Sequence, residues 1–361
     1  MVEPLQQFSA IVADFYFSEL PNLIQKTGIH LELPSLEAPV ATFSDAQILG
    51  FHTISPDVMH RIISNPVGLV SMPTSYARFP ILWVALAHEI CGHDVVRAFD
   101  RDPAKESRLI MELQDSLSKM TNVNDQWRGV WRAWFEEAVA DVYGMIFLGP
   151  HFAVGMAAWL SATNAYSAVY PPQKIGGLTS SFWVDGDEVS EHPPNLIRMY
   201  ILMGALDELA RTGSSVIGDY SNMLRNMIDE AQRYQSIVTV IDRNQDEAMF
   251  AYEAAPIIHD ALQIGAHIAS IKLETLGGAS VADLLPWTIE KCNQTKAFCQ
   301  LCLDNNDDIK NELPGKQFTS CHMVAGALMA VTENPTLIKQ INARLQQGLS
   351  YRYEYPGNGS D

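Results

Sequence analysis

Residues 81–94 read ILWVALAHEICGHD, a stretch in which an apolar run meets two histidines and an acid. The apolar run, 81–87, predicts a buried helix. His88, Glu89 and His93 follow directly. A catalytic zinc site needs two neutral nitrogen ligands on one element and a carboxylate close enough to take a proton from water. The stretch therefore predicts a metal site on a buried helix.

The spacing of the two histidines requires a distorted helix. The common zincin motif, His-Glu-x-x-His, places its histidines four positions apart, whereas His88 and His93 are five apart, in a His-Glu-x-x-x-His pattern. In a regular α-helix such residues point about 140° apart, too far to share one ion. A single π-type turn absorbs the extra residue, and Gly92 lowers the steric barrier to that turn. We therefore expect a local π-turn at this motif.

A third ligand is expected from a helix further along the chain. Apolar residues recur at three- and four-residue steps over 127–145, so one helix face is buried, and the string EEAVAD lies within it at 136–141. Adjacent acids are costly to bury unless they are paired or bind a metal. Glu137 can complete a His, His, Glu zinc site. Asp141, on the same face, can accept a hydrogen bond from a ligand imidazole, with Glu136 also in the shell around the ligands.

An alternative interpretation leaves these acids without a metal. In that case the three carboxylates form ion pairs with Arg128 and Arg132 on a solvated helix face.

The strings HEICGH and EEAVAD together resemble the signatures of the dipeptidyl peptidase III family of zinc metallopeptidases. That family also has five-residue histidine spacing with glycine before the second histidine, and its downstream motif also opens with two glutamates. The resemblance implies that His88, His93 and Glu137 are zinc ligands and that Glu89 is the general base. Asp141 stands where the family has glutamate. The match covers these two motifs in a shorter chain, so the family's substrate is not carried over.

A third string, EHPPNLIRMY at 191–200, is similar to a pattern in membrane prenyl-protease and heat-shock-protease metallopeptidases and their soluble glutamate-zincin relatives. This resemblance implies that His192 hydrogen-bonds the oxyanion of the tetrahedral intermediate and that Arg198 orients a carboxylate. A donor aimed at developing negative charge stabilises a transition state. The alternative is that the His-Pro-Pro run only ends a loop, and that Asn195 caps the helix that follows.

These patterns predict a zinc-dependent metallopeptidase that hydrolyses the amide bonds of a peptide or protein substrate, with Glu89 as general base. The alternative from another class is an inactive, zincin-derived binding or scaffold protein, which would not need Glu89. A di-iron helical bundle would need Glu-x-x-His pairs on two helices, a pattern that the chain does not offer.

The composition of the chain limits the classes of molecule that it is expected to bind. Against 24 basic residues the chain has 42 acidic ones, a formal charge of −18 without a basic cluster, which argues against nucleic acid and anionic membranes. The start of the chain has no signal-peptide pattern, and the apolar stretch 142–160 is broken by Gly149-Pro150, which predicts two helices and no membrane span. We expect a cytoplasmic protein with reduced cysteines. A second zinc at Cys299, Cys302 and Cys321 is the less favoured interpretation.

The expected fold is mainly α, with a zincin-like core, a C-terminal helical part and at most a small sheet. We expect a zinc-binding part at 1–215, a helical part at 216–350 that walls the cleft, and a flexible tail at 351–361. Beyond residue 213, helical patterns occur at 219–242, 247–275, 279–303, 318–331 and 335–347. Residues 46–54 predict a short strand, and in zincins an edge strand near the metal helix often pairs with substrate.

Overall fold

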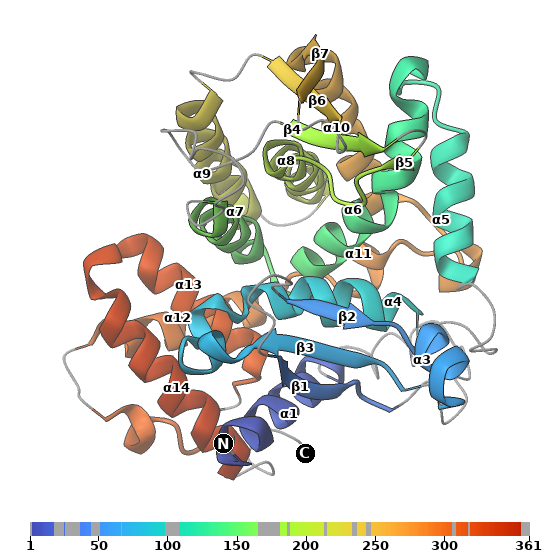
Figure 1. The fold of residues 1–361 in the computed structure, drawn as a ribbon. Helices are drawn as coiled ribbons and strands as arrows, with labels where there is room; N and C mark the ends of the chain where they lie inside the picture. Colours follow the sequence, from blue (N-terminus) through green and yellow to red (C-terminus); the bar gives the residue numbers. More distant parts are fainter. Residues whose placement is uncertain are drawn as a thin grey trace.

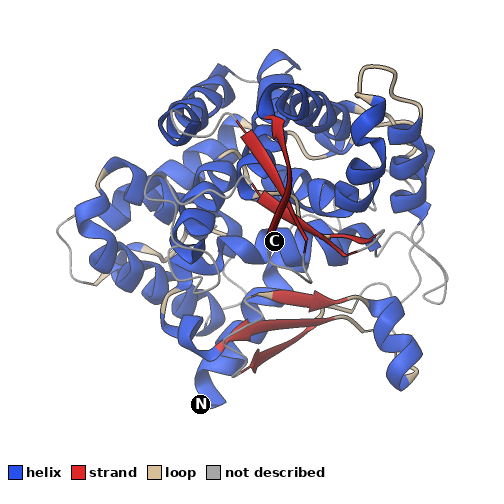
Figure 2. Ribbon diagram, turned by 45° about the horizontal axis from the view of Figure 1, so that its top comes forward, coloured by secondary structure: helices blue, strands red, loops and turns tan. Residues whose placement is uncertain are grey.

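The computed structural model describes residues 2–17, 25, 37–44, 51–65, 67–97, 108–164, 181–185, 188–212, 215–232, 237–242, 247–304, 308–316 and 318–354. This part of the chain is mainly helical, which confirms the prediction of a mainly α fold, and its strands form two small separate sheets (Figures 1 and 2). The α-helices are α1 (Val2–Phe17), α3 (Pro56–Ile63), α4 (Val95–Arg97), α5 (Arg108–Ser118), α6 (Arg128–Leu148), α7 (His151–Asn164), α8 (Asn195–Thr212), α9 (Ser215–Gln232), α10 (Ala254–Ser270), α11 (Val281–Leu284), α12 (Ile289–Leu303), α13 (Ser320–Glu333) and α14 (Ile338–Glu354).

The first sheet holds the strand that the sequence predicted. Its strands are β1 (Val40–Ser44), β2 (His52–Ile54) and β3 (Leu69–Pro73), in the order β1-β3-β2. β1 runs parallel to β3 and β2 runs antiparallel to it. The predicted strand is thus confirmed at its C-terminal end, whereas residues 45–50 lie outside the described part. Among the described strands, β2 pairs with β3 alone and forms one end of the sheet.

The second sheet corrects the sequence prediction. β4 (Ser181–Asp185), β5 (Glu188–Val189), β6 (Ile237–Asp242) and β7 (Glu247–Glu253) pair in the order β5-β4-β6-β7. β6 and β7 are antiparallel, whereas the helical patterns predict the end of one helix and the start of the next at these residues. The β-branched run of β6 alternates between buried and more exposed positions, as a half-buried strand does. The helices α9 and α10 fill only the remainder of the two predicted spans.

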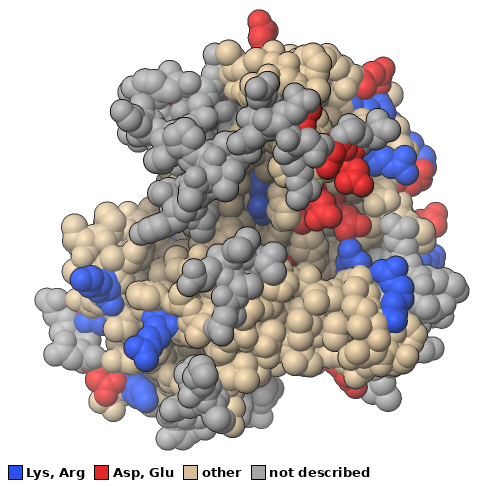
Figure 3. All heavy atoms as spheres, viewed as in Figure 1, with Lys and Arg blue, Asp and Glu red and all other residues tan. Residues whose placement is uncertain are grey.

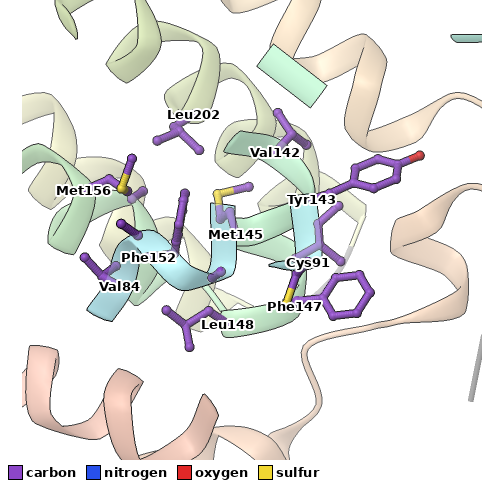
Figure 4. Packing of buried hydrophobic residues seen from close by; sticks show 14 of the residues in the cluster. Val84, Cys91, Val142, Tyr143, Met145, Phe147, Leu148, Phe152, Met156 and Leu202 are labelled. Atoms are coloured by element: carbon purple, nitrogen blue, oxygen red, sulfur yellow. The ribbon is translucent and has the colours of Figure 1, made fainter. Parts of the chain in front are cut away.

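The predicted distortion at the metal motif is confirmed. After a 3₁₀ segment at Pro80–Val84, the chain forms a π-helix over Ala87–Asp94. This π-helix packs against α6 within the hydrophobic core, and Figure 4 shows Cys91 of the π-helix beside buried side chains of α6. Gly92 contributes in a way that the sequence did not show. A Cβ on it would stand 2.4 Å from the Ala140 carbonyl oxygen, so glycine permits the close approach of the two helices.

Gly92→Ala is expected to destabilise the protein by about 3 kcal/mol, the upper end for overpacking, because backbone atoms of Ala140 block the new methyl group. Gly129→Ala on α6 is the matched control, since a Cβ there meets nothing within 4 Å. It should leave stability unchanged or raise it by up to about 1 kcal/mol. Urea unfolding of both variants measures the difference. Equal stabilities would contradict a close approach of Gly92 to the Ala140 backbone.

The C-terminal helices share one core with the rest of the chain. α10 packs on α8 and α6, and α14 packs on α1 and α13 (Figure 1). The predicted boundary at 215/216 falls after the first residue of α9, and α9 packs on α8. α14 extends to Glu354, into the predicted tail, and the rest of that tail lies outside the described residues.

The apolar stretch 142–160 is divided as predicted. α6 ends at Leu148, Gly149 adopts a positive φ of 94°, and α7 begins at His151. Within the described part of the chain, each helix is too short or too polar to cross a membrane.

The burial of His151 is expected to make the stability of the fold depend on pH. The ring is 3% exposed, packs on Tyr220 and Trp287, and contacts the Tyr220 hydroxyl through Nε2 at 3.2 Å. Its Nδ1 has no hydrogen-bond partner among the described residues. Burial, helped by the positive charge of Lys296, lowers the pKa of His151 to about 3.

Stability is therefore expected to fall on acidification below about pH 6.5, the ordinary histidine pKa, because the unfolded chain takes up a proton that folded His151 does not. Between pH 7 and pH 5 the loss from this residue amounts to about 2 kcal/mol. His151→Gln keeps a polar group for Tyr220 but does not titrate, so its stability should fall less over the same range. Urea unfolding at several pH values tests this. Parallel pH profiles for the two proteins would be the contrary result.

Candidate metal centre

The π-helix turns both histidines of the motif to the same side. Its i→i+5 hydrogen-bond pattern places a residue five positions on nearly above the first. The rings of His88 and His93 accordingly lie edge to face, with centroids 4.9 Å apart and planes at 87°. Both are largely buried. The extra residue in the motif is therefore what brings the two imidazoles together.

Glu137 of α6 faces both imidazoles. Its Oε2 lies 3.2 Å from Nε2 of His88, and its Oε1 lies 3.3 Å from Nε2 of His93. One donor atom from each of the three residues lies within 4.8 Å of the others. In the described part of the chain, no other group of three His, Cys, Asp or Glu residues meets this criterion. The structure thus brings together the three residues that the sequence predicted as ligands.

The arrangement of these atoms fits a divalent cation. Glu137 Oε2 is buried and makes no hydrogen bond to any described residue, although His88 Nε2 lies 3.2 Å away. One donor atom from each of the three residues lies close enough to the others to share an ion. A cation held among them would satisfy the buried carboxylate oxygen. Two imidazole nitrogens and one carboxylate are the donor set of catalytic zinc sites that keep a position open for water or substrate.

Behind His88, a buried network fixes the orientation of the ring. Nδ1 of His88 contacts Oδ1 of Asp141 at 2.9 Å, and Asp141 is fully buried. Arg198 of α8 donates to both oxygens of Asp141, at 2.8 and 2.7 Å. A carboxylate on the outer nitrogen directs the other nitrogen toward the metal position. The predicted contact between Asp141 and the His88 imidazole is present, and Arg198 lies on that same carboxylate.

The charges around the site shift the pKa values of the ligand side chains. Burial lowers the pKa of His88, but the charges of Glu137 and Asp141 outweigh it and raise that pKa to about 10. Burial raises the pKa of Glu137, yet the two histidines hold it well below its usual value. The pKa of Asp141 is likewise lowered, because Arg198 outweighs the effect of burial. The acids are thus held as carboxylates, the form that binds a metal.

Glu89 and His192, the two side chains that the sequence predicted to take part in the reaction, lie near the three ligand candidates. Glu89 lies on the π-helix next to His88, is 8% exposed, and is near enough to His192 and Arg198 for its charge to act on both. His192 places Nε2 3.4 Å from Glu137 Oε2, with 62% of its side chain exposed. The site is therefore open to solvent on the His192 side.

Two hydrogen bonds to backbone carbonyl groups fix the loop that carries His192. The indole N–H of Trp134 on α6 donates to the Ser190 carbonyl at 2.9 Å, and the Ser190 hydroxyl donates to the His192 carbonyl at 3.1 Å. Both bonds act on the backbone that leads from β5 into α8. They position the backbone of His192, whose side chain is exposed.

Glu136 lies apart from the ligands. It forms an ion pair with Arg97 at 2.8 Å, and among the described residues it makes no hydrogen bond to the three ligand candidates. The alternative, in which the acids of this helix pair with Arg128 and Arg132, is also not what the structure shows. Arg128 binds Asp125 at 2.8 Å, and among the described residues Arg132 forms no ion pair with these acids.

The cysteines form no second metal group in the described residues. Cys299 and Cys302 on α12 and Cys321 on α13 are buried and form no disulfide. Burial raises the pKa of Cys299 and of Cys302 to about 12, which disfavours the thiolate that binds metal.

One part of the site was not predicted. Asp94, which follows His93, is 1% exposed, and both oxygens of its carboxyl group lie within hydrogen-bond distance of the Thr53 hydroxyl of β2. A carboxylate inside an apolar helix is a sequence signal for such a bond. Nothing in the sequence indicates Thr53 as its partner, because the two lie 41 positions apart.

Comparisons of the chain with protein-family models, with curated proteins and with solved structures find no match. The assignment of a function therefore depends on the geometry of the site.

Proposed function

We propose that this chain is a zinc-dependent metallopeptidase. The observation that carries the proposal is the convergence of His88, His93 and Glu137 on one point, produced by a π-helix that the five-residue spacing requires. These three side chains would hold the ion. The motif resemblance to zinc metallopeptidases supports the same assignment.

Bound zinc would supply Lewis acidity, which makes water a stronger acid and polarises the scissile carbonyl. Glu89 accepts a proton from the attacking water and delivers it to the departing amine. Its burial beside His88 removes the carboxylate from bulk solvent while leaving it near His192. This position suits a group that exchanges a proton with the reacting atoms.

His192 and Arg198 have two further roles, one at the substrate carbonyl and one in positioning His88. His192, on the open side of the site, donates a hydrogen bond to the carbonyl oxygen as it gains negative charge. Arg198 touches Asp141 through two hydrogen bonds and is buried, so we assign it as a positioning residue that acts through Asp141 on His88. The structure does not place Arg198 where it would contact substrate.

The surroundings of the site suit an extended peptide. β2 packs against the π-helix and ends its sheet, so among the described strands one of its edges is unpaired. An extended peptide can add to such an edge through main-chain hydrogen bonds. The face in Figure 3 is hollowed between the part with α7–α10 and the part with β1–β3, and acidic side chains line its upper rim. We propose that the substrate peptide lies along β2.

Incubating the zinc-loaded chain with a mixed peptide library, and following new amino termini by mass spectrometry, tests the proposal. Cleavage that stops after chelation and returns with zinc is the expected result. Stoichiometric zinc without cleavage of any library member would favour the alternative, an inactive scaffold derived from a peptidase.

A further inference from the structure

We propose that Asp94 is a positioning residue, anchored to Thr53 of β2, that fixes His93 at the metal. The inference rests on the proposed zinc site, and it assigns a task to a buried carboxylate that the reaction itself does not use.

The contact joins the end of the metal helix to the first sheet. The Thr53 hydroxyl lies 3.0 Å from Oδ2 and 3.2 Å from Oδ1 of Asp94, and 3.2 Å from the Leu69 carbonyl of β3. Asp94 also fits closely against Gly68, where an added Cβ would stand 3.0 Å from Oδ1. The carboxylate is thus held between β2 and the residue that leads into β3.

His93 needs such an anchor more than His88 does. The outer nitrogen of His88 is held by Asp141, which Arg198 holds in turn. Among the described residues, the ring of His93 has its close polar contact with Glu137, and it has no second carboxylate of that kind. Its position is therefore set by the backbone at the end of the π-helix. Asp94 is the adjacent residue of that backbone.

The chemistry of the contact also indicates a positional role. Burying a carboxylate is costly unless hydrogen bonds offset the loss of water. An apolar side chain would be less costly to bury in the same space, but it would not fix the orientation of the backbone that carries His93. A hydrogen bond does so, because its strength depends on the alignment of donor and acceptor. We infer that the Thr53–Asp94 bond holds the π-turn in the register that brings His93 to the ion.

Thr53→Val removes the hydroxyl and keeps the β-branched shape of a strand residue. We expect zinc affinity to fall about 10- to 100-fold, the range for groups that orient metal ligands. With cobalt in place of zinc, the absorption bands of the bound ion should shift and weaken, because His93 is less well fixed. Thr53→Ser, which restores a hydroxyl, should recover both the affinity and the spectrum.

In Gly68→Ala the new methyl group stands 3.0 Å from Oδ1 of the same carboxyl group, so the variant should shift the cobalt spectrum in the same sense while leaving Thr53 in place. Thr332→Val on α13 is the control, since it deletes a hydrogen bond of 2.9 Å to Leu328 outside the site. It should change neither quantity. Circular dichroism restricts the comparison to folded variants.

Parental affinity and an unchanged cobalt spectrum in folded Thr53→Val or Gly68→Ala would overturn the proposal. No peptide is needed, so the result is independent of turnover. If the parent chain binds zinc without cleaving peptides, and Thr53→Val binds zinc more weakly, the peptidase proposal is wrong and the positioning role of Asp94 is supported. A parent chain that binds no zinc would overturn both.

Discussion

Glu89→Gln is expected to lower kcat/KM for peptide hydrolysis by about 10³-fold, within the range for loss of a general base. The substitution keeps the size of a side chain that is 8% exposed and removes its ability to accept a proton. Because the three ligand candidates are untouched, zinc content and thermal stability should match the parent chain. Steady-state kinetics on a cleaved peptide, with zinc measured on the same sample, checks the prediction.

The same change at Glu136 serves as the control for Glu89→Gln. Glu136 pairs with Arg97 at the side of α6, away from the ligands, so Glu136→Gln should retain parental kinetics within a few-fold. Full activity of Glu89→Gln would show that another group accepts the proton, and the role of Glu89 as general base would be wrong.

Glu137→Gln is expected to weaken zinc binding by more than about 100-fold, beyond the loss that follows changes in groups that only orient ligands. The substitution replaces a buried carboxylate that faces two imidazoles with a neutral amide. A charged oxygen ligand is lost, so hydrolysis should fall with the zinc content. Competition with a chromogenic chelator measures the affinity.

The adjacent residue again gives a matched comparison, because Glu136→Gln makes the same chemical change one position away. Its zinc affinity should equal that of the parent chain. If both variants bound zinc alike, the ion would not be held by Glu137, and the site would have to be sought elsewhere.

The sequence could predict the local geometry of the site because the spacing of the two histidines allows few helix geometries. Two histidines five apart can share an ion only if the helix between them is distorted, and the structure has a π-helix at Ala87–Asp94. The face shared by Glu137 and Asp141 followed from helical spacing in the same way. The role of Gly92 could not be predicted, since it depends on the Ala140 backbone of another helix.

Local sequence patterns could not predict the contacts between residues far apart in the chain, or the strands that pair through such contacts. The chain at Ile237–Asp242 is rich in β-branched residues, but it follows a long amphipathic helix, so the local pattern predicts one continuous helix through both. The pairing of β4 with β6 joins segments that no local periodicity connects. The Thr53–Asp94 contact has the same origin, because it forms only once β2 lies against the π-helix.

X-ray absorption spectroscopy of the zinc-loaded chain tests the central claim most directly, because it identifies the atoms around the ion. We predict one zinc per chain, with two imidazole nitrogens and oxygen ligands at about 2.0–2.2 Å and no sulfur. Sulfur neighbours at about 2.3 Å would place the ion on the buried cysteines instead. That result, or a single imidazole, would contradict a site formed by His88, His93 and Glu137.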